Sequence, residues 1–209
     1  MRRLSGEDAL FLYGETPTMP MHTVGTLILD PSGVPGGFGF EQIAKTLAAR
    51  LHRLPPFRQR LLEVPLGLGH PLLVDDPEFR LENHLHRLAV PAPGGLRELA
   101  LVVGELAGRP LDRNQPLWEM WGVEGLEGGR MALVTKLHHC MMDGASGTNQ
   151  MGALMDFAPD APPPEPPPGR WRPLPLPSPL AIAVRSAGSR LVGPGRLGRL
   201  LYRTGKGVL

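Results

Sequence analysis

Hydrophobic residues recur along the chain with two different spacings, which predict helices and strands. Apolar side chains at helical spacing occupy residues 40–54 and 96–106, and Ser5 can cap a short helix over residues 5–13. Strands are predicted over residues 22–29, 58–64, 72–74, 118–124 and 130–138. Strands interleaved with helices predict an α/β lobe in which helices cover a mixed β-sheet.

The strand before the two histidines shows the clearest alternation. From Met131 to His139, every second residue shares a face, which places His139 with the more apolar side chains and His138 with Lys136. An imidazole shielded from water stays neutral near pH 7 and can accept a proton. We therefore expect His139 to be a catalytic general base, on a strand that forms a hairpin with residues 118–124.

Asp143 and Gly144 follow the histidines and predict a chain reversal. An Asp at this point can cap the helix expected next, and the free N–H groups of that helix would then lie near the imidazole. This arrangement favours Asp143 as an orienting group rather than a proton carrier.

Metal binding and a thiol nucleophile are both disfavoured. Neighbouring strand residues point to opposite faces, so His138 and His139 cannot share a metal ion, and no further ligand completes a set. His84 and His86 would share a strand face, but only Glu82 is nearby. Cys140 is the single cysteine, so no internal disulfide can form, and we interpret it as a structural thiol.

Three motifs in order carry a resemblance to a known family. They are the His-His-x-x-x-Asp-Gly sequence at residues 138–144, the opening residues 4–12 with Thr-Pro at 16–17 and Pro-Met-His at 20–22, and the Pro-Leu-Trp motif within residues 110–119. The first motif resembles that of the CoA-dependent acyltransferase superfamily, which includes chloramphenicol acetyltransferases and condensation domains of peptide synthetases. All three together resemble the bacterial wax ester synthase/diacylglycerol acyltransferase family.

The resemblance implies both a fold and a reaction. The fold is a chloramphenicol-acetyltransferase-like lobe, and the reaction is direct acyl transfer from acyl-CoA to the hydroxyl of diacylglycerol or a long-chain alcohol. His139 matches the base of the family, His138 and Gly144 have supporting places, and Asp143 is held in a structural ion pair. The Pro-Leu-Trp motif, Pro116, Leu117 and Trp118, would shape the substrate site. No cofactor is implied, since acyl-CoA is a co-substrate.

Composition divides the chain into three parts. Residues 1–158 form the expected acyltransferase lobe, residues 159–179 are a proline-rich linker, and residues 180–209 form a basic amphipathic connector without Asp or Glu. The resemblance implies two similar lobes with the active site between them, and this chain covers only the first lobe and the connector. We therefore expect this polypeptide to be a fragment, a cleavage product or one of two chains, and to need a C-terminal lobe.

The basic connector allows two interpretations. It could lie on an anionic membrane or lipid-droplet surface, or its apolar side could pack on the second lobe. Nucleic-acid binding is disfavoured, because the connector has almost no aromatic residues for base stacking. No apolar run approaches the roughly 20 residues that span a bilayer. These features predict a cytoplasmic protein, peripheral on the inner membrane or on lipid droplets.

Two other functions stay open from sequence. One is a condensation domain that acts on carrier-bound acyl groups, and the other is a non-catalytic lipid-binding lobe. The acceptor, whether diacylglycerol or a fatty alcohol, cannot be read from these residues.

Overall fold

The computed structural model describes residues 1–141, 152–156, 165, 169, 171–184 and 186. Within these residues the strands form a four-stranded sheet and a three-stranded sheet. The four-stranded sheet is mixed, because β5 runs parallel to β6 while the other neighbours are antiparallel. Its order is β2-β7-β6-β5, with β2 at His22–Leu29, β5 at Leu85–Ala89, β6 at Trp118–Glu124 and β7 at Met131–His138.

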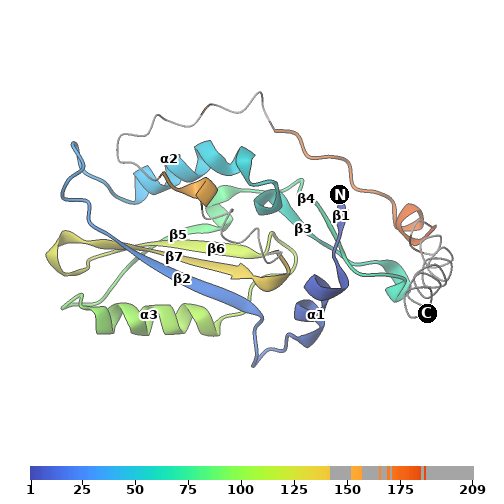
Figure 1. Ribbon diagram of the computed structural model, residues 1–209, viewed down its shortest axis with the longest axis horizontal. Coiled ribbons are helices and arrows are strands. Elements are labelled where there is room, and N and C mark those ends of the chain that lie inside the picture. Colours follow the sequence, from blue (N-terminus) through green and yellow to red (C-terminus); the bar gives the residue numbers. More distant parts are fainter. Residues whose placement is uncertain (142–151, 157–164, 166–168, 170, 185, 187–209) are drawn as a thin grey trace, which may run out of the picture.

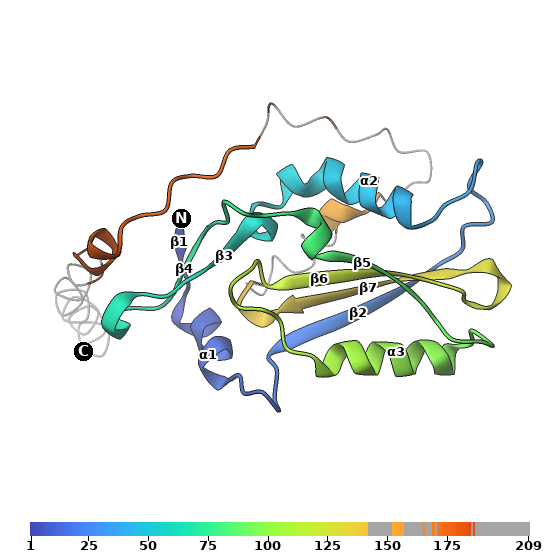
Figure 2. The same ribbon diagram turned by 180° about the vertical axis from the view of Figure 1, so that it is seen from behind.

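Two helices cover opposite faces of this sheet, as Figures 1 and 2 both show. They are α2 (Phe40–Arg50) and α3 (Leu96–Gly108). Side chains under α2 form one buried cluster and those under α3 form another. Because successive strand residues point to opposite faces, β7 is buried from both sides, and Leu133 is its only partly exposed residue.

Glycines shape the sheet at two places. A Cβ atom on Gly122 of β6 would lie 2.8 Å from Cδ2 of Phe40, the first residue of α2, so the missing side chain lets the helix approach the sheet. The turn between β6 and β7 contains η5 (Glu127–Gly129), where Gly128 and Gly129 both have a φ of 71°. This left-handed backbone favours glycine, and it closes the predicted hairpin.

Helix α1 (Gly6–Gly14) lies against the turn that follows β7. Its start is a capping box, in which the Ser5 hydroxyl accepts the Asp8 N–H at 3.0 Å and the Asp8 carboxylate accepts the Ser5 N–H at 3.4 Å. Ala9 and Leu12 are buried in the core under this helix. The helix thereby anchors the beginning of the chain next to the paired histidines.

The smaller sheet is antiparallel and has the order β1-β4-β3. Short 3-10 turns connect its strands to one another and to the rest of the lobe. The strands are β1 (Arg2–Arg3), β3 (Gln59–Leu62) and β4 (Leu72–Asp75), and the turns are η1 (Leu51–Arg53), η2 (Pro55–Arg58), η3 (Pro65–Gly67) and η4 (Leu81–Asn83).

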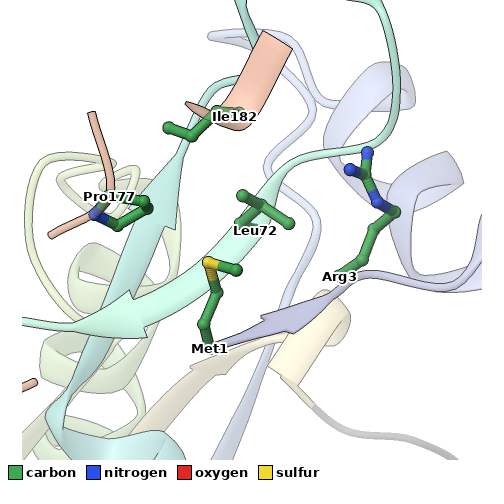
Figure 3. A pocket seen from close by; sticks show the side chains of 5 residues that line it. All are labelled: Met1, Arg3, Leu72, Pro177 and Ile182. Carbon is green, nitrogen blue, oxygen red and sulfur yellow. The ribbon is translucent and has the colours of Figure 1, made fainter. Parts of the chain in front are cut away.

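Residues 171–184 pass back over the smaller sheet. Residues 179–184 are helical, and Ile182 is buried in a cluster with residues of β4. Figure 3 shows Ile182 and Pro177 facing Leu72 and Met1 around a small cavity of about 150 Å³. Arg3 donates a hydrogen bond of 2.7 Å to the Ser186 hydroxyl. Part of the predicted connector therefore packs on the lobe itself.

The α/β prediction is confirmed, with specific differences. The strands at residues 22–29 and 118–124 have the predicted bounds, but the strands divide between two sheets, and β1 and β5 were not predicted. Helix α2 ends at Arg50 and continues to Arg53 as a 3-10 turn, before Pro55 and Pro56. In the described parts of the chain, the helices fall short of what a membrane span requires in length and apolar character.

Candidate active site

The two histidines lie at the end of β7, but only one belongs to the strand. His138 is its last residue and pairs with His22 of β2, while His139 opens the turn η6 (His139–Met141). The alternation that placed His139 on an apolar strand face therefore does not reach it, and that part of the prediction is wrong. The turn, rather than the strand, places the ring of His139.

His139 is held by its backbone and by one aromatic ring. Its N–H donates to the Met21 carbonyl at 2.9 Å, and its imidazole stacks on Phe11 of α1 with ring centroids 4.7 Å apart and planes at 18°. The residue is partly exposed. The ring is thus fixed in a residue that is not sealed from solvent, as a group that exchanges a proton with a substrate must be.

His138 is the sheltered imidazole of the pair. It is fully buried, and this burial lowers its pKa from 6.5 to about 4, against the opposing pull of the Glu15 carboxylate. The ring is therefore neutral at pH 7. Sequence reasoning assigned this shelter to His139, and that assignment is wrong because α3 covers the face of β7 that carries Lys136 and His138.

Hydrogen bonding fixes which nitrogen of His138 carries the proton. Nδ1 accepts the backbone N–H of Cys140 at 3.1 Å, so we assign the proton to Nε2. Nε2 forms no well-aligned hydrogen bond, but it faces Oε1 of Glu15 at 3.4 Å. Because the ring is neutral, this contact is a long N–H···O contact rather than an ion pair. Because Nδ1 already accepts a hydrogen bond and Nε2 carries the proton, His138 is poorly placed to act as a base.

Glu15 joins three segments of the chain around the histidines. Its carboxylate accepts hydrogen bonds from Arg113 Nε at 3.0 Å and Nη2 at 2.6 Å, and from the Met21 N–H at 3.1 Å. Burial alone would raise the pKa of Glu15, but these bonds and the nearby positive charge lower it overall. Arg113 also donates to the Leu12 carbonyl at 2.8 Å. An ionised carboxylate therefore fastens the end of α1 to the segment before β6.

Lys136 is buried although the sequence gave it a polar face. Its ammonium donates to the carbonyls of Leu106 and Arg109 at 3.1 and 2.9 Å and lies 3.0 Å from the Glu119 carboxylate. Cations are favourable at a helix C-terminus, where carbonyl groups lack partners. Lys136 thus fastens the end of α3 to the sheet, two residues before His138.

Cys140 is buried, and burial raises the pKa of its thiol to about 12. A thiol with this pKa is protonated at neutral pH and is a poor nucleophile. The structural interpretation of Cys140 agrees with these observations, although η6 rather than strand alternation sets its direction.

The Pro-Leu-Trp motif lies beside the histidines and is buried throughout. The Leu117 carbonyl accepts the His138 N–H at 3.0 Å, and Trp118 donates from Nε1 to the Phe57 carbonyl at 2.9 Å. Pro116 is buried as well. These contacts make the motif part of the support under β7, while its contact with substrate stays a prediction.

The second histidine pair does not share a face. His84 is buried, donates from Nδ1 to the Trp118 carbonyl at 2.8 Å and stacks on the Trp118 ring, whereas His86 lies against Trp121. His84 precedes β5 and has turn geometry, so strand alternation does not apply to it. Among the residues that the structure describes, no cluster of three or more His, Cys, Asp or Glu side chains could hold a metal ion.

An apolar groove lies on the α2 side of the four-stranded sheet. Its volume is about 530 Å³, and Leu133, the partly exposed residue of β7, contributes to its lining. Arg50 borders the groove, is buried, donates to the Leu154 carbonyl at 2.6 Å and pairs with Asp156. The full lining is Leu27, Leu29, Phe38, Ile43, Thr46, Leu47, Arg50, Met120, Leu133, Leu154, Met155 and Asp156.

Asp143 and Gly144 lie outside the described residues, as does the turn predicted there. Of the predicted site residues, the structure therefore brings together His138, His139 and the Pro-Leu-Trp motif. The orienting role of Asp143 and the space provided by Gly144 stay predictions.

The overall arrangement is a fold of acyl-transferring and condensing enzymes. The starter condensation domain of a rhizomide synthetase matches 73% of this chain and 37% of that domain, with a TM-score of 0.52 and 13% identity, which shows a shared fold only. A wax ester synthase/diacylglycerol acyltransferase from Marinobacter aquaeolei matches more closely, with a TM-score of 0.64 and 33% identity over 78% of this chain and 41% of that one.

The sequence identifies the family. The model of the wax ester synthase/diacylglycerol acyltransferase catalytic domain matches residues 4–203, so the chain belongs to this family. A relative from Mycobacterium tuberculosis H37Rv, whose name assigns it to the diacylglycerol O-acyltransferases, is 46% identical over 79% of this chain. The chain spans about a third (33%) of that relative. The M. tuberculosis protein tgs3, named in the same class, is 37% identical over 92% of this chain and 70% of its own length.

Sequence reasoning missed Phe11, Glu15 and Arg113. Phe11 and Arg113 lie inside motifs that were recognised, and Glu15 lies directly before the Thr-Pro pair. The available signal was Glu15 itself, a charged residue between two recognised segments of the opening motif. Its significance comes only from the folded contacts, because 98 residues separate Glu15 from Arg113.

Proposed function

We propose that this chain is the base-bearing lobe of an acyl-CoA-dependent O-acyltransferase. The acyl group would pass to the hydroxyl of diacylglycerol or of a long-chain alcohol, with no cofactor. The single observation that carries this proposal is the placement of His139, which is partly exposed yet fixed by Met21 and Phe11 in a chain of this family.

The reaction follows from the His139 imidazole as proton acceptor and from the Cys140 thiol, which is a poor nucleophile. His139 removes the proton of the acceptor hydroxyl while the oxygen attacks the thioester carbonyl carbon. The carbon–sulfur bond breaks, the ester forms, and the CoA thiolate takes up the proton. An acyl-cysteine intermediate is disfavoured by the buried, protonated Cys140. General-base help contributes about 10²–10⁴-fold, so alignment and oxyanion stabilisation must supply the rest.

The apolar groove would accommodate the fatty acyl chain. It lies on the sheet face that leads along β7 toward the histidines, and Leu133 is five residues before the end of that strand, about 17 Å at the usual rise per residue. A long acyl chain can cover such a span. Apolar side chains dominate the lining, which suits a hydrocarbon ligand.

Other parts of the proposal concern partners and location. A C-terminal lobe would complete the active site, with Asp143 orienting the loop, Gly144 leaving space and the Pro-Leu-Trp motif shaping the substrate site. The protein would be cytoplasmic and peripheral on the inner membrane or on lipid droplets, where the basic connector would meet anionic lipid.

A substrate panel tests this proposal. Acyl-CoA and acceptor are varied independently, and products are detected by mass spectrometry, for the chain alone and mixed with a C-terminal lobe from a mycobacterial relative. We expect ester formation that needs His139, so His139→Ala should lose about 10²–10⁴-fold in kcat. Unchanged turnover in His139→Ala would remove this residue from the mechanism.

The groove also favours a second candidate, a lobe that binds lipid without catalysis. This candidate predicts that fatty acyl ligands bind and that no ester forms under any pairing of substrates. Binding that survives in His139→Ala, together with turnover that does not, decides in favour of the enzyme.

A further inference from the structure

One carboxylate connects all three sequence motifs that identify the family. Glu15 lies within the opening segment, its partner Arg113 lies in the segment that contains Pro-Leu-Trp, and His138 begins the His-His-x-x-x-Asp-Gly motif. The three contacts bring together residues 15, 113 and 138. Glu15 is therefore the point at which the segments around His139 are joined.

The backbone of Met21 connects Glu15 directly to His139. Its N–H donates to Glu15 at 3.1 Å, and its carbonyl accepts the His139 N–H at 2.9 Å. A second route runs through His138, whose Nε2 faces Glu15 at 3.4 Å and whose Nδ1 holds the Cys140 N–H at 3.1 Å. His138 and Cys140, the residues before and after His139, are thus linked to the Glu15 side chain through the His138 ring.

We propose that Glu15, supported by Arg113, is a positioning residue that sets the η6 turn and so aims the imidazole of His139. The proposal rests on the proposed function for its kinetic consequence, but not for its structural one. Glu15 does not act on the substrate. It holds the Met21 peptide and faces the N–H of His138, and Arg113 holds the carboxylate in place.

A carboxylate suits this position better than an amide. All its contacts are N–H donors, from Arg113, from Met21 and from His138, and a carboxylate offers only acceptors. A Gln side chain has nearly the same shape, but it would present an NH₂ group to one of these donors. Glu15→Gln therefore preserves volume while weakening the connection.

A purely structural ion pair is the competing explanation, and Asp76 provides a matched control. Asp76 is also a buried carboxylate that faces an arginine, Arg60 Nε at 3.6 Å, and accepts a backbone N–H, from Glu78 at 3.1 Å, but it lies beside the smaller sheet. Both substitutions, Glu15→Gln and Asp76→Asn, should lower stability. Only Glu15→Gln should also displace His139.

The experiment combines kinetics with hydrogen exchange and ¹⁵N NMR on the full chain. Glu15→Gln should lower kcat by about 10–100-fold with little change in KM, since a misplacement of about 1 Å can cost 10²-fold. The His139 amide should exchange about tenfold faster, because opening of its bond to Met21 becomes easier. The ¹⁵N shifts of His138 should show loss of the pure Nε2–H tautomer. Asp76→Asn should change none of these.

The outcomes separate this proposal from the function it rests on. If the wild-type chain makes no ester in any pairing, the proposed function fails, but faster His139 exchange in Glu15→Gln still supports positioning. If Glu15→Gln matches Asp76→Asn in kcat, exchange and tautomer, Glu15 is only a stabilising ion pair and the positioning role is overturned. If Glu15→Gln fails to fold, Arg113→Lys, which keeps the charge but not the paired bonds, is measured in the same three ways.

Discussion

The two sides of β7 have opposite designs. Toward α3, Lys136 and His138 are fully buried, and their polar atoms face helix carbonyls, carboxylates and a backbone N–H. Toward α2, Leu133 is partly exposed and borders the apolar groove. We call the first the sealed side, because polar contacts close it at Lys136 and His138, and the second the hollow side, because the groove opens on it at Leu133 although Met131 and Leu137 are buried.

This difference shows how a strand can carry a reactive group at its end. Buried charges are costly unless they are paired, so the sealed side has few alternative arrangements and fixes the end of the strand. The hollow side leaves space for an apolar ligand next to that fixed end. His139 lies just beyond the strand and draws on both properties, since its backbone is held while the residue stays partly exposed.

The largest expected effect separates the two histidines. His139→Ala should lower kcat by about 10²–10⁴-fold. Because His139 is partly exposed, this substitution should change the unfolding free energy of the protein by no more than about 1 kcal/mol. His138→Asn should instead lower stability, with a smaller loss of kcat. Urea unfolding and steady-state kinetics on both variants test this contrast, and equal kinetic losses would contradict it.

The sealed side should depend strongly on Lys136. Lys136→Met removes the cation from the end of α3 and leaves Glu119 without its partner, so we expect a loss of about 3 kcal/mol in unfolding free energy. Arg87→Met breaks an exposed pair with Glu124 and should cost less than about 1 kcal/mol. Similar losses in the two variants would show that burial of Lys136 is not decisive.

The buried His138 should also make stability depend on pH. The pKa of His138 is about 4 in the folded chain and 6.5 when the imidazole is unperturbed. Between these pH values the unfolded chain therefore binds a proton at His138 that the folded chain does not bind. Stability is then lost as the pH falls from about 6.5 to 4, by about 3 kcal/mol for this shift. His138→Asn should remove that part of the loss.

Denaturant unfolding between pH 7 and pH 4 measures this effect. Two other buried groups contribute in the same direction and remain in the variant, namely His84, whose pKa burial lowers, and Glu15, whose pKa is lowered overall. The comparison is therefore the difference between the wild-type and variant curves, with His86→Asn as a partly exposed control. Parallel curves for wild type and His138→Asn would contradict the prediction.

Local patterns predicted most of the fold but not the two-sided burial of β7. Strands β2 and β6 and the hairpin follow from alternation and from paired glycines, which act within a few residues. Alternation also separates the faces of β7 correctly, yet it does not show that the less apolar face, which carries Lys136, is buried. Only the position of α3 shows that its helix end needs a buried cation, and this contact joins segments 27 residues apart.

The candidate site was predicted in part, for the same reason. The motifs identify the family and select His138 and His139, but they do not show which ring is buried or where the strand ends. Those facts depend on α1, which supplies Phe11, and on Glu15 and Arg113. Contacts across about a hundred residues leave no periodic signal in the sequence.

The smallest expected effect concerns the hollow side. Leu133→Phe adds volume where the groove borders β7, so the site should accept long acyl chains less well while short ones still fit. We expect kcat/KM for a 16-carbon acyl-CoA to fall about tenfold and that for an 8-carbon acyl-CoA to stay within about twofold, because even one methylene in an apolar pocket is worth about 1–3 kcal/mol.

Leu101→Phe on the exposed face of α3 is the matched control and should change kcat/KM for neither acyl-CoA. If Leu133→Phe lowers both chain lengths equally, the substitution disturbs the strand rather than the ligand. If Leu133→Phe lowers kcat/KM for neither chain length, the acyl chain lies elsewhere. The hollow side of β7 then loses its proposed role in binding the acyl chain, while the role of the sealed side in fixing the strand end is unaffected. A selective loss of the longer chain would place the hydrocarbon on the α2 side of the sheet, opposite the contacts that fix His138.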